Sequence, residues 1–158
     1  MDRRGVLGLG TVGMFAAILG RRSIAMAEPS FRVSHTPAEW RALLKPDAYQ
    51  VLRQAGTEAP YASALLGEHR HGVFACAGCN QAAFSSATKY DSHTGWPSFW
   101  AVLPHAVGTT QDRSLLMART EVHCSRCGGH LGHVFDDGPR PTGKRYCMNG
   151  AALSFQTN

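Results

Sequence analysis

The chain has no dense run of lysine and arginine, although its formal net charge is +5 over 158 residues. Most of this excess comes from Arg3, Arg4, Arg21 and Arg22 near the N-terminus, and the remaining charges are nearly balanced. Nucleic-acid-binding domains instead gather their basic residues on one face or in one stripe. The charge pattern therefore excludes a basic footprint for nucleic acid.

The chain also lacks the glycine motifs that hold nucleotides. It contains no P-loop, and no dinucleotide fingerprint in which a glycine-rich turn joins a strand to a helix. It has no low-complexity tract and no internal repeat beyond two short cysteine pairs. Any redox chemistry would therefore have to draw its electrons from outside the chain.

No apolar run is long enough to span a membrane comfortably. The mildly apolar segment 6–20 is shorter than the roughly 20 residues that a bilayer requires. It lies between Arg3-Arg4 and Ala25-Met26-Ala27, a small-x-small cleavage pattern. We therefore predict a twin-arginine-type signal peptide over residues 1–27 and a single periplasmic domain over residues 28–158. The alternatives are a cytoplasmic protein and one that stays anchored by its N-terminus.

Length and composition fit one globular domain. The sequence is 44% hydrophobic and 17% charged, as in ordinary soluble domains. Thr36-Pro37-Ala38-Glu39 is a capping box with proline at the first helical position, which predicts a short helix to about Leu44. A second helix is predicted from about Pro46 to Gln54, because Gly56 can end it.

From Gly72 onward the pattern is that of a β domain with long loops. Glycine and proline separate short apolar runs, as in antiparallel strands joined by turns. The predicted strands are Val73–Ala75, Leu115–Val122, His133–Phe135, Arg145–Asn149 and Ala152–Phe155. We therefore expect a mainly β fold with short N-terminal helices.

Four of the five cysteines form two Cys-x-x-Cys pairs. Cys76 and Cys79 make up the first pair, Cys124 and Cys127 make up the second, and residues 80–123 separate them. Two such pairs can supply the four thiolates of a tetrahedral zinc site without an open position. We therefore predict one structural Zn²⁺ ion. A redox pair and two disulfides are the alternatives for an exported protein.

The fifth cysteine, Cys147, is left without a structural partner. A buried, inert thiol is the default interpretation of such a residue. Residues two apart in an extended strand share a face, so Arg145, Cys147 and Asn149 project together while Tyr146 and Met148 point into the core. Because a neighbouring cation stabilises the reactive thiolate, this face favours Cys147 as a nucleophile.

Two further groups of residues lie near these cysteines in the sequence. His130 and His133 follow the second pair, and Thr94-Gly95-Trp96-Pro97-Ser98-Phe99-Trp100 precedes it. By themselves, the histidines are typical of polar surface groups or of additional zinc ligands, and the aromatic segment is typical of packing around a turn. Imidazole also suits proton transfer at neutral pH, which a nucleophile with a poor leaving group requires.

Taken in order, these motifs resemble the methionine-(R)-sulfoxide reductase B family. The resemblance runs from about Gly56 to Phe155. The segments that carry it are Cys76-Ala77-Gly78-Cys79, Thr94–Trp100, Arg119-Thr120-Glu121-Val122, Cys127–Phe135, Asp137–Gly143 and Arg145–Asn149. It implies a fold of two antiparallel β-sheets with N-terminal helices, which agrees with the strand pattern.

The resemblance also implies roles for the polar site residues. Cys147 matches the catalytic cysteine, whose thiolate attacks the sulfoxide sulfur. Arg145 matches the arginine that favours this thiolate. His130, His133 and Asn149 match polar residues that hold water and help to protonate the departing oxygen.

Substrate and metal contacts follow from the same resemblance. Trp96 matches the indole that receives the ε-methyl group of the substrate and helps to select the R epimer, and Phe135 is expected to contact the substrate beside it. The four paired cysteines match zinc ligands in a site remote from the chemistry.

The implied activity is reduction of methionine-R-sulfoxide in oxidised proteins and peptides to methionine. The reaction leaves a sulfenic acid on Cys147, which a thiol can reduce. We therefore expect a thioredoxin-like or other dithiol reductant as a partner, and a monomeric enzyme. The alternatives are a non-catalytic zinc-binding interaction module with Cys147 buried, and a thiol–disulfide exchanger that uses the cysteine pairs.

Three residues depart from the pattern of the family. Thr94 stands where many members carry the resolving cysteine, so a step of their usual cycle is missing here. His93 replaces a common glycine, and Gly150 replaces a common serine.

Overall fold

The computed structural model of the chain describes residues 30–114 and 118–157. The predicted signal peptide, residues 1–27, lies outside these residues and stays a prediction. In the part of the chain that is described, no helix has both the length and the apolar character needed to cross a membrane.

Two short helices open the described part of the chain, α1 (Pro37–Leu43) and α2 (Pro46–Gln54). The hydroxyl of Thr36 accepts a hydrogen bond from the backbone N–H of Glu39, whose carboxylate accepts one from the N–H of Thr36 at 2.7 Å. This is the predicted capping box. Helix α2 ends at Ala55, which has a left-handed conformation with a φ of 51°. Both predicted helices are confirmed.

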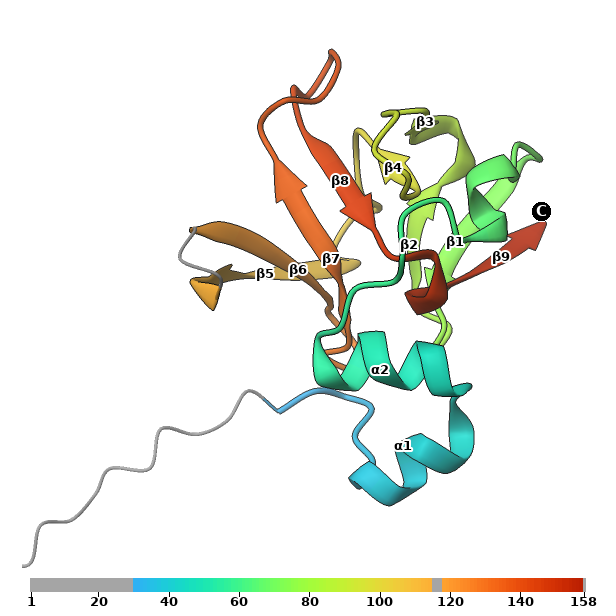
Figure 1. Cartoon of the computed structure of the whole chain (residues 1–158), viewed down its shortest axis with the longest axis vertical. Coiled ribbons are helices and arrows are strands. Elements are labelled where there is room, and N and C mark those ends of the chain that lie inside the picture. The colour runs from blue at the N-terminus through green and yellow to red at the C-terminus, as the bar shows by residue number, and fades with distance from the viewer. Residues whose placement is uncertain (1–29, 115–117, 158) are drawn as a thin grey trace, which may run out of the picture.

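The strands form two antiparallel sheets (Figure 1). The first sheet has the order β2–β1–β9, with β1 (Gly72–Cys76), β2 (Ala82–Ser85) and β9 (Leu153–Thr157). The second has the order β3–β4–β8–β7–β6–β5, with β3 (Lys89–Tyr90), β4 (Ser98–Phe99), β5 (Val107–Asp112), β6 (Arg119–Cys124), β7 (His130–Phe135) and β8 (Arg145–Met148). Single turns of 3₁₀ helix are η1 (Ala64–Gly67), η2 (Ser86–Thr88) and η4 (Gly150–Ala152). The predicted mainly β fold with two antiparallel sheets is confirmed.

Several strand boundaries differ from the sequence-based expectation. The strand predicted at Leu115–Val122 is observed as β6, which begins at Arg119 and continues to Cys124, while residues 115–117 lie outside the described part. Strand β5 was not predicted, because it lies at the edge of its sheet and most of its side chains are exposed or half-exposed. Strands β3 and β4 have only two residues each, too few for a detectable alternation.

Aromatic side chains fill the space between the two sheets. Phe74 and Phe84 of the first sheet meet Phe99 of the second, with ring centroids 5.0 and 4.4 Å away. These rings are fully buried together with Leu131 of β7 and Met148 of β8. Each such side chain contributes about 1.5–3 kcal/mol through burial. This packing fixes β7 and β8 from one side and leaves their other side free to carry a site.

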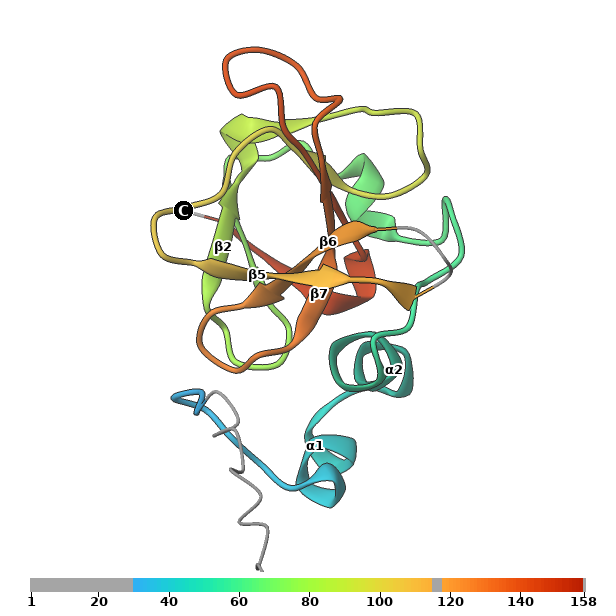
Figure 2. The ribbon, with the colours of Figure 1, turned by 90° about the vertical axis from the view of Figure 1, so that its left-hand side faces the viewer.

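Helix α2 packs against β7 and η4. Figure 2 shows that both helices lie at one end of the strands. Its apolar side chains Val51 and Leu52 are buried, and so is Trp40 of α1. The chain then passes from α2 towards Thr57 and Glu58, which reach the exposed side of β8.

Candidate active site and metal centre

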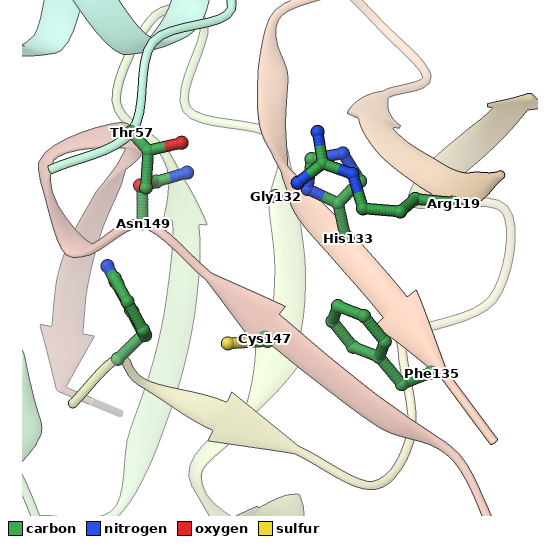
Figure 3. Close-up of a pocket in the computed structure, with 8 residues that line it drawn as sticks. Thr57, Arg119, Gly132, His133, Phe135, Cys147 and Asn149 are labelled. Atoms are coloured by element: carbon green, nitrogen blue, oxygen red, sulfur yellow. The ribbon is translucent and has the colours of Figure 1, made fainter. Parts of the chain in front are cut away.

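A cavity of about 130 Å³ lies over β7 and β8 (Figure 3). The residues that line it are Thr57, Trp96, Arg119, Gly132, His133, Phe135, Cys147 and Asn149. Five of the residues predicted from the sequence thus surround one small volume, although they come from separate segments of the chain. Of the predicted site residues, Arg145 and His130 do not line this cavity.

Cys147 lies in the middle of the second sheet. It pairs with Ser98 of β4 on one side and with His133 of β7 on the other. Strands β7 and β8 approach closely at Gly132, where a Cβ atom would lie 2.2 Å from the carbonyl oxygen of Cys147. The predicted alternation holds, because Cys147 and Asn149 face the cavity while Met148 is fully buried in the core.

His133 is held by a carboxylate. Its Nε2 donates to Oδ2 of Asp112 over 2.8 Å, and Nη2 of Arg119 donates to the same oxygen over 2.7 Å. Hydrogen bonds from Ser114, His133 and Arg119 keep the pKa of Asp112 well below its usual range. Burial lowers the pKa of His133, partly offset by the hydrogen bond to Asp112. At neutral pH, the imidazole is therefore neutral, with Nδ1 as a proton acceptor.

His130 lies behind His133. The side chain is buried, its Nδ1 is 2.7 Å from Oε1 of Glu121, and the two imidazole centroids are 5.4 Å apart at an interplanar angle of 66°. Within residues 30–114 and 118–157, its Nε2 makes no hydrogen bond. His130 therefore contacts His133 and does not line the cavity itself.

Glu58 joins two of the residues that line the cavity. Its backbone N–H donates to Oδ1 of Asn149 over 3.0 Å, and its carbonyl oxygen accepts from Nε1 of Trp96 over 3.1 Å. Its carboxylate accepts from the backbone N–H groups of Gly150 and Ala151. One residue therefore sets the positions of both Asn149 and Trp96.

Arg145 lies beside the cavity and is engaged elsewhere. Its guanidinium makes two parallel hydrogen bonds to Asp137, each of 2.8 Å, and lies 4.3 Å from the ring centroid of Phe135. The hydrogen bond to Asp137 raises the pKa of Arg145. Its direct effect here is to fix Phe135, a wall of the cavity.

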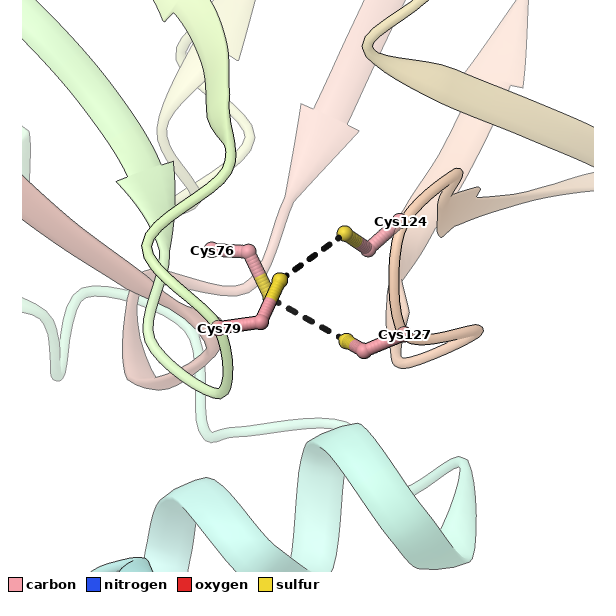
Figure 4. A group of neighbouring side chains, drawn as sticks. All are labelled: Cys76, Cys79, Cys124 and Cys127. Atoms are coloured by element: carbon pink, nitrogen blue, oxygen red, sulfur yellow. Dashed lines mark hydrogen bonds between the residues drawn. The ribbon is translucent and has the colours of Figure 1, made fainter. Parts of the chain in front are cut away.

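The four paired cysteines form a separate cluster (Figure 4). Their sulfur atoms all lie within 4.8 Å of one another. Sγ of Cys76 is 3.7 Å from Sγ of Cys127, and Sγ of Cys79 is 3.5 Å from Sγ of Cys124. Four sulfurs around zinc at about 2.3 Å are about 3.8 Å apart, whereas a disulfide requires about 2.05 Å. The cluster therefore fits a tetrahedral metal ion, and the four cysteines are positioned to bind one.

The charges of this cluster also favour a metal. Hydrogen bonds from neighbouring sulfurs raise the pKa of Cys76 and Cys79 and lower that of Cys127. Four thiolates this close together repel one another, and a cation among them would offset this repulsion. Arg53 of α2 covers the cluster, since its guanidinium donates to the carbonyl oxygen and to Sγ of Cys127, the latter over 3.3 Å.

Residues 44–157 match the SelR domain family. The chain belongs to this family, that of the methionine sulfoxide reductases B. The peptide methionine sulfoxide reductase MsrB of Leifsonia xyli is 54% identical over 128 residues, which cover 80% of this chain and 92% of the relative. The protein of the same name from Methanosarcina barkeri is 52% identical over 126 residues, or 79% of this chain and 89% of the relative.

One solved structure is also similar in part. The "Crystal Structure of Mis18 'Yippee-like' Domain" superposes with a TM-score of 0.46 at 21% identity, covering 56% of this chain and 98% of that chain. This similarity is too weak to bear on function. The match to the SelR family, in contrast, confirms the predicted enzyme class and decides against a non-catalytic zinc module.

His93 and Gly150, named above as departures from the family pattern, have distinct surroundings. His93 has a φ of 57°, a left-handed conformation that glycine adopts most easily, and its backbone N–H is held by Asp91 at 2.8 Å. At Gly150, a Cβ atom would lie 1.8 Å from Oγ of Ser63, so Ser63 occupies the space that a side chain at this position would need.

Sequence reasoning missed four residues that line the cavity or bond to its lining. Arg119 was noted only as part of a motif, and Glu58 was not named. Thr57 lines the cavity and Asp112 holds His133, yet neither had been singled out. Asp112 ends β5, which had no detectable pattern, so its place beside His133 depends on a pairing that the sequence does not reveal.

Proposed function

We propose that this enzyme reduces methionine-R-sulfoxide in proteins and peptides with Cys147 as its nucleophile. The observation that carries the proposal is the cavity itself, which gathers a thiol, an imidazole, an amide and two aromatic rings around about 130 Å³. Family membership supports the reaction class, and the side chains support the individual roles.

The proton transfers follow from the protonation state of His133. Neutral His133 takes the proton of the Cys147 thiol, and the thiolate attacks the sulfur of the sulfoxide. The imidazolium then returns the proton to the sulfoxide oxygen, the sulfur–oxygen bond of the substrate breaks, and the oxygen leaves as hydroxide. The hydroxide attacks Sγ of Cys147, which breaks the transient sulfur–sulfur bond and releases methionine. The products are methionine, reduced by two electrons, and a sulfenic acid on Cys147, oxidised by two. Asp112 keeps the ring orientation and the tautomer during this cycle.

The oxygen and the methyl group of the substrate contact different residues of the cavity: Asn149 binds the oxygen, and Trp96 and Phe135 contact the methyl group. Asn149 uses Oδ1 and one N–H of its amide for Glu58 and Leu131, so its second N–H remains for the sulfoxide oxygen. Trp96 and Phe135 provide apolar faces for the ε-methyl group. A stereocentre with oxygen and methyl exchanged would place the oxygen against these rings, which accounts for selection of the R epimer.

The metal has a structural role in this proposal. Cys76, Cys79, Cys124 and Cys127 hold one Zn²⁺, which when bound ties the end of β1 to the end of β6 and supplies no chemistry at the cavity. A thioredoxin-like or other dithiol reductant regenerates Cys147 directly, because Thr94 replaces the resolving thiol. We also propose that the protein is periplasmic and is cleaved near residue 27, as the N-terminal pattern supports. The proposal further includes a single domain over residues 28–158 and a monomeric state.

Peptides with R- or S-methionine sulfoxide test the proposal directly. With dithiothreitol as reductant, the wild-type protein should reduce the R peptide and leave the S peptide unchanged. Cys147→Ser should abolish reduction while retaining zinc and circular dichroism, because it removes the nucleophile alone. Substantial turnover by the Cys147→Ser protein would refute the assignment.

A further inference from the structure

A series of hydroxyl groups ends at Cys147, on the side away from His133. Oγ1 of Thr94 lies 3.7 Å from Sγ of Cys147 and 2.8 Å from Oγ of Ser92. Oγ of Ser92 is 2.7 Å from Oγ of Ser98, which donates to the carbonyl oxygen of Trp96 over 3.2 Å. Three hydroxyls thus connect the nucleophile to a backbone carbonyl.

The direction of these hydrogen bonds is determined by the carbonyl at the end. Each hydroxyl has one hydrogen to donate, and a carbonyl can only accept. Ser98 donates to Trp96, so Ser92 must donate to Ser98 and Thr94 to Ser92. Thr94 then offers Cys147 only a lone pair, which suits the S–H of the neutral thiol.

A thiolate requires the opposite direction. If the O–H bond of each hydroxyl rotates, the direction of donation reverses. Ser98 then donates to Ser92, Ser92 donates to Thr94, and Thr94 donates to the sulfur of Cys147. The only hydrogen bond lost is that from Ser98 to Trp96, whose 3.2 Å makes it the longest of the O···O contacts in the series. The gain is a hydrogen bond to a charged sulfur, which is stronger than one between neutral groups.

We propose that Thr94, Ser92 and Ser98 form a reversible hydrogen-bond chain that accepts from the Cys147 thiol and donates to its thiolate. The proposal rests on the proposed role of Cys147 as the nucleophile. Thr94 touches the reacting sulfur and is therefore a catalytic residue, while Ser92 and Ser98 act through it as positioning residues. This hydrogen-bond chain gives a function to the hydroxyl of Thr94, the residue that stands in place of a resolving cysteine.

Charged and titratable groups also face Cys147 from the neighbouring elements. Arg145 precedes it on β8 and is paired with Asp137, and Tyr90 lies on β3 with its hydroxyl buried. Across the cavity are His133 and Arg119, both bound to Asp112. Strand β4 contributes no titratable group. Among the described residues, however, the sulfur of Cys147 forms a hydrogen bond with Thr94 alone.

The reactivity of Cys147 towards iodoacetamide tests the chain without any methionine sulfoxide. Zinc-loaded full-length protein is alkylated over a range of pH, and the rate at Cys147 is followed by mass spectrometry. Thr94→Val should move the midpoint of the profile to higher pH and lower the rate at pH 7 by about tenfold, because the thiolate loses its donor. Thr94→Ser keeps the hydroxyl and should restore the wild-type profile, whereas Thr94→Ala should behave like Thr94→Val.

A double-mutant cycle tests whether Ser92 acts through Thr94. Ser92→Ala should shift the alkylation profile in the wild-type background and have no effect in the Thr94→Val background. An unchanged profile for Thr94→Val with zinc content and circular dichroism intact would overturn the proposal, as would equal effects of Ser92→Ala in both backgrounds. Either result leaves the reduction of R-sulfoxide by Cys147 untouched, since that reaction is tested separately with Cys147→Ser.

Discussion

The metal cluster and the cavity use the same side chain in opposite surroundings. Three of the four clustered cysteines, Cys76, Cys124 and Cys127, are buried, and each lies within 3.7 Å of another sulfur of the cluster. Cys147 is half-buried and lines a cavity. The hydroxyl of Thr94 lies on one side of it, and strand β7 with His133 lies on the other. The proposed role of each cysteine follows from its neighbours: a cysteine among other sulfurs is positioned to bind a metal, and one beside proton donors and acceptors is positioned to act as a nucleophile.

The two regions also differ in what they connect. Cys76 ends a strand of the first sheet and Cys124 ends a strand of the second, so a metal ion between them joins the two sheets. Cys147 lies within one sheet and is held by core packing on the far side of its strand. Changes in the first region should therefore affect stability, and changes in the second should affect chemistry.

The largest effect is expected when a metal ligand is removed. Cys124→Ser should release zinc and leave the protein unfolded or with a sharply lower melting temperature. A structural zinc site contributes about 10–16 kcal/mol in small zinc domains, which is comparable with the whole stability of a domain. Zinc content and thermal unfolding by circular dichroism measure this.

Cys147→Ser is the matched control, since it removes a sulfur of the same chain outside the cluster. It should keep its zinc and a melting temperature near that of the wild type. Full zinc occupancy in Cys124→Ser, or metal loss in Cys147→Ser, would break the division between the two regions.

The next largest effect concerns proton transfer at the cavity. His133→Ala should lower kcat/KM for the R peptide by about 10²–10⁴-fold, the usual contribution of a general acid–base group. Its melting temperature and zinc content should change little, because His133 contacts the cavity and not the metal cluster. A loss of less than tenfold would remove His133 from the proposed mechanism.

The dependence on pH should reveal the same histidine. Burial lowers the pKa of His133, so its neutral form persists to more acidic pH than that of an ordinary histidine. Protonated His133 cannot accept the thiol proton of Cys147, so activity should fall as the pH drops through this lowered pKa. Asp112→Asn removes the carboxylate that raises the pKa of His133 and should move this acidic limb to still lower pH. A wild-type acidic limb above pH 6.5 would contradict the assignment.

The smallest effect is expected at the side chain that covers the metal cluster. Arg53→Ala should weaken zinc binding by about 10–100-fold, as for other residues that orient metal ligands, because the guanidinium donates to Sγ of Cys127. Arg126→Ala is a suitable control, since Arg126 reaches only the carbonyl oxygen of Cys79 and is exposed. Competition with a zinc chelator compares the two variants, and equal affinities would remove Arg53 from the metal site.

Local patterns made the fold largely predictable. The capping box at Thr36 and the proline at the start of each helix located α1 and α2 almost to the residue, because these signals act over a single turn. Alternation along β8 correctly separated Cys147 from Met148. Strand β5 could not be predicted, since an exposed edge strand carries no apolar alternation.

The residues of the cavity were predictable only in part. Cys147, His133, Asn149, Trp96 and Phe135 were found because they lie in recognisable motifs. Partners such as Asp112 and Glu58 were missed, because they reach the site through strand pairing and loop crossing that join distant parts of the sequence.

Intact mass spectrometry after a single turnover tests the division of the five cysteines most directly. Zinc-loaded protein is oxidised with one equivalent of the R-sulfoxide peptide in the absence of reductant. The account predicts a gain of one oxygen on Cys147, which dimedone traps, with zinc retained by the other four cysteines. Loss of two hydrogens together with release of zinc would contradict it, because a cysteine of the metal cluster would then have resolved the sulfenic acid.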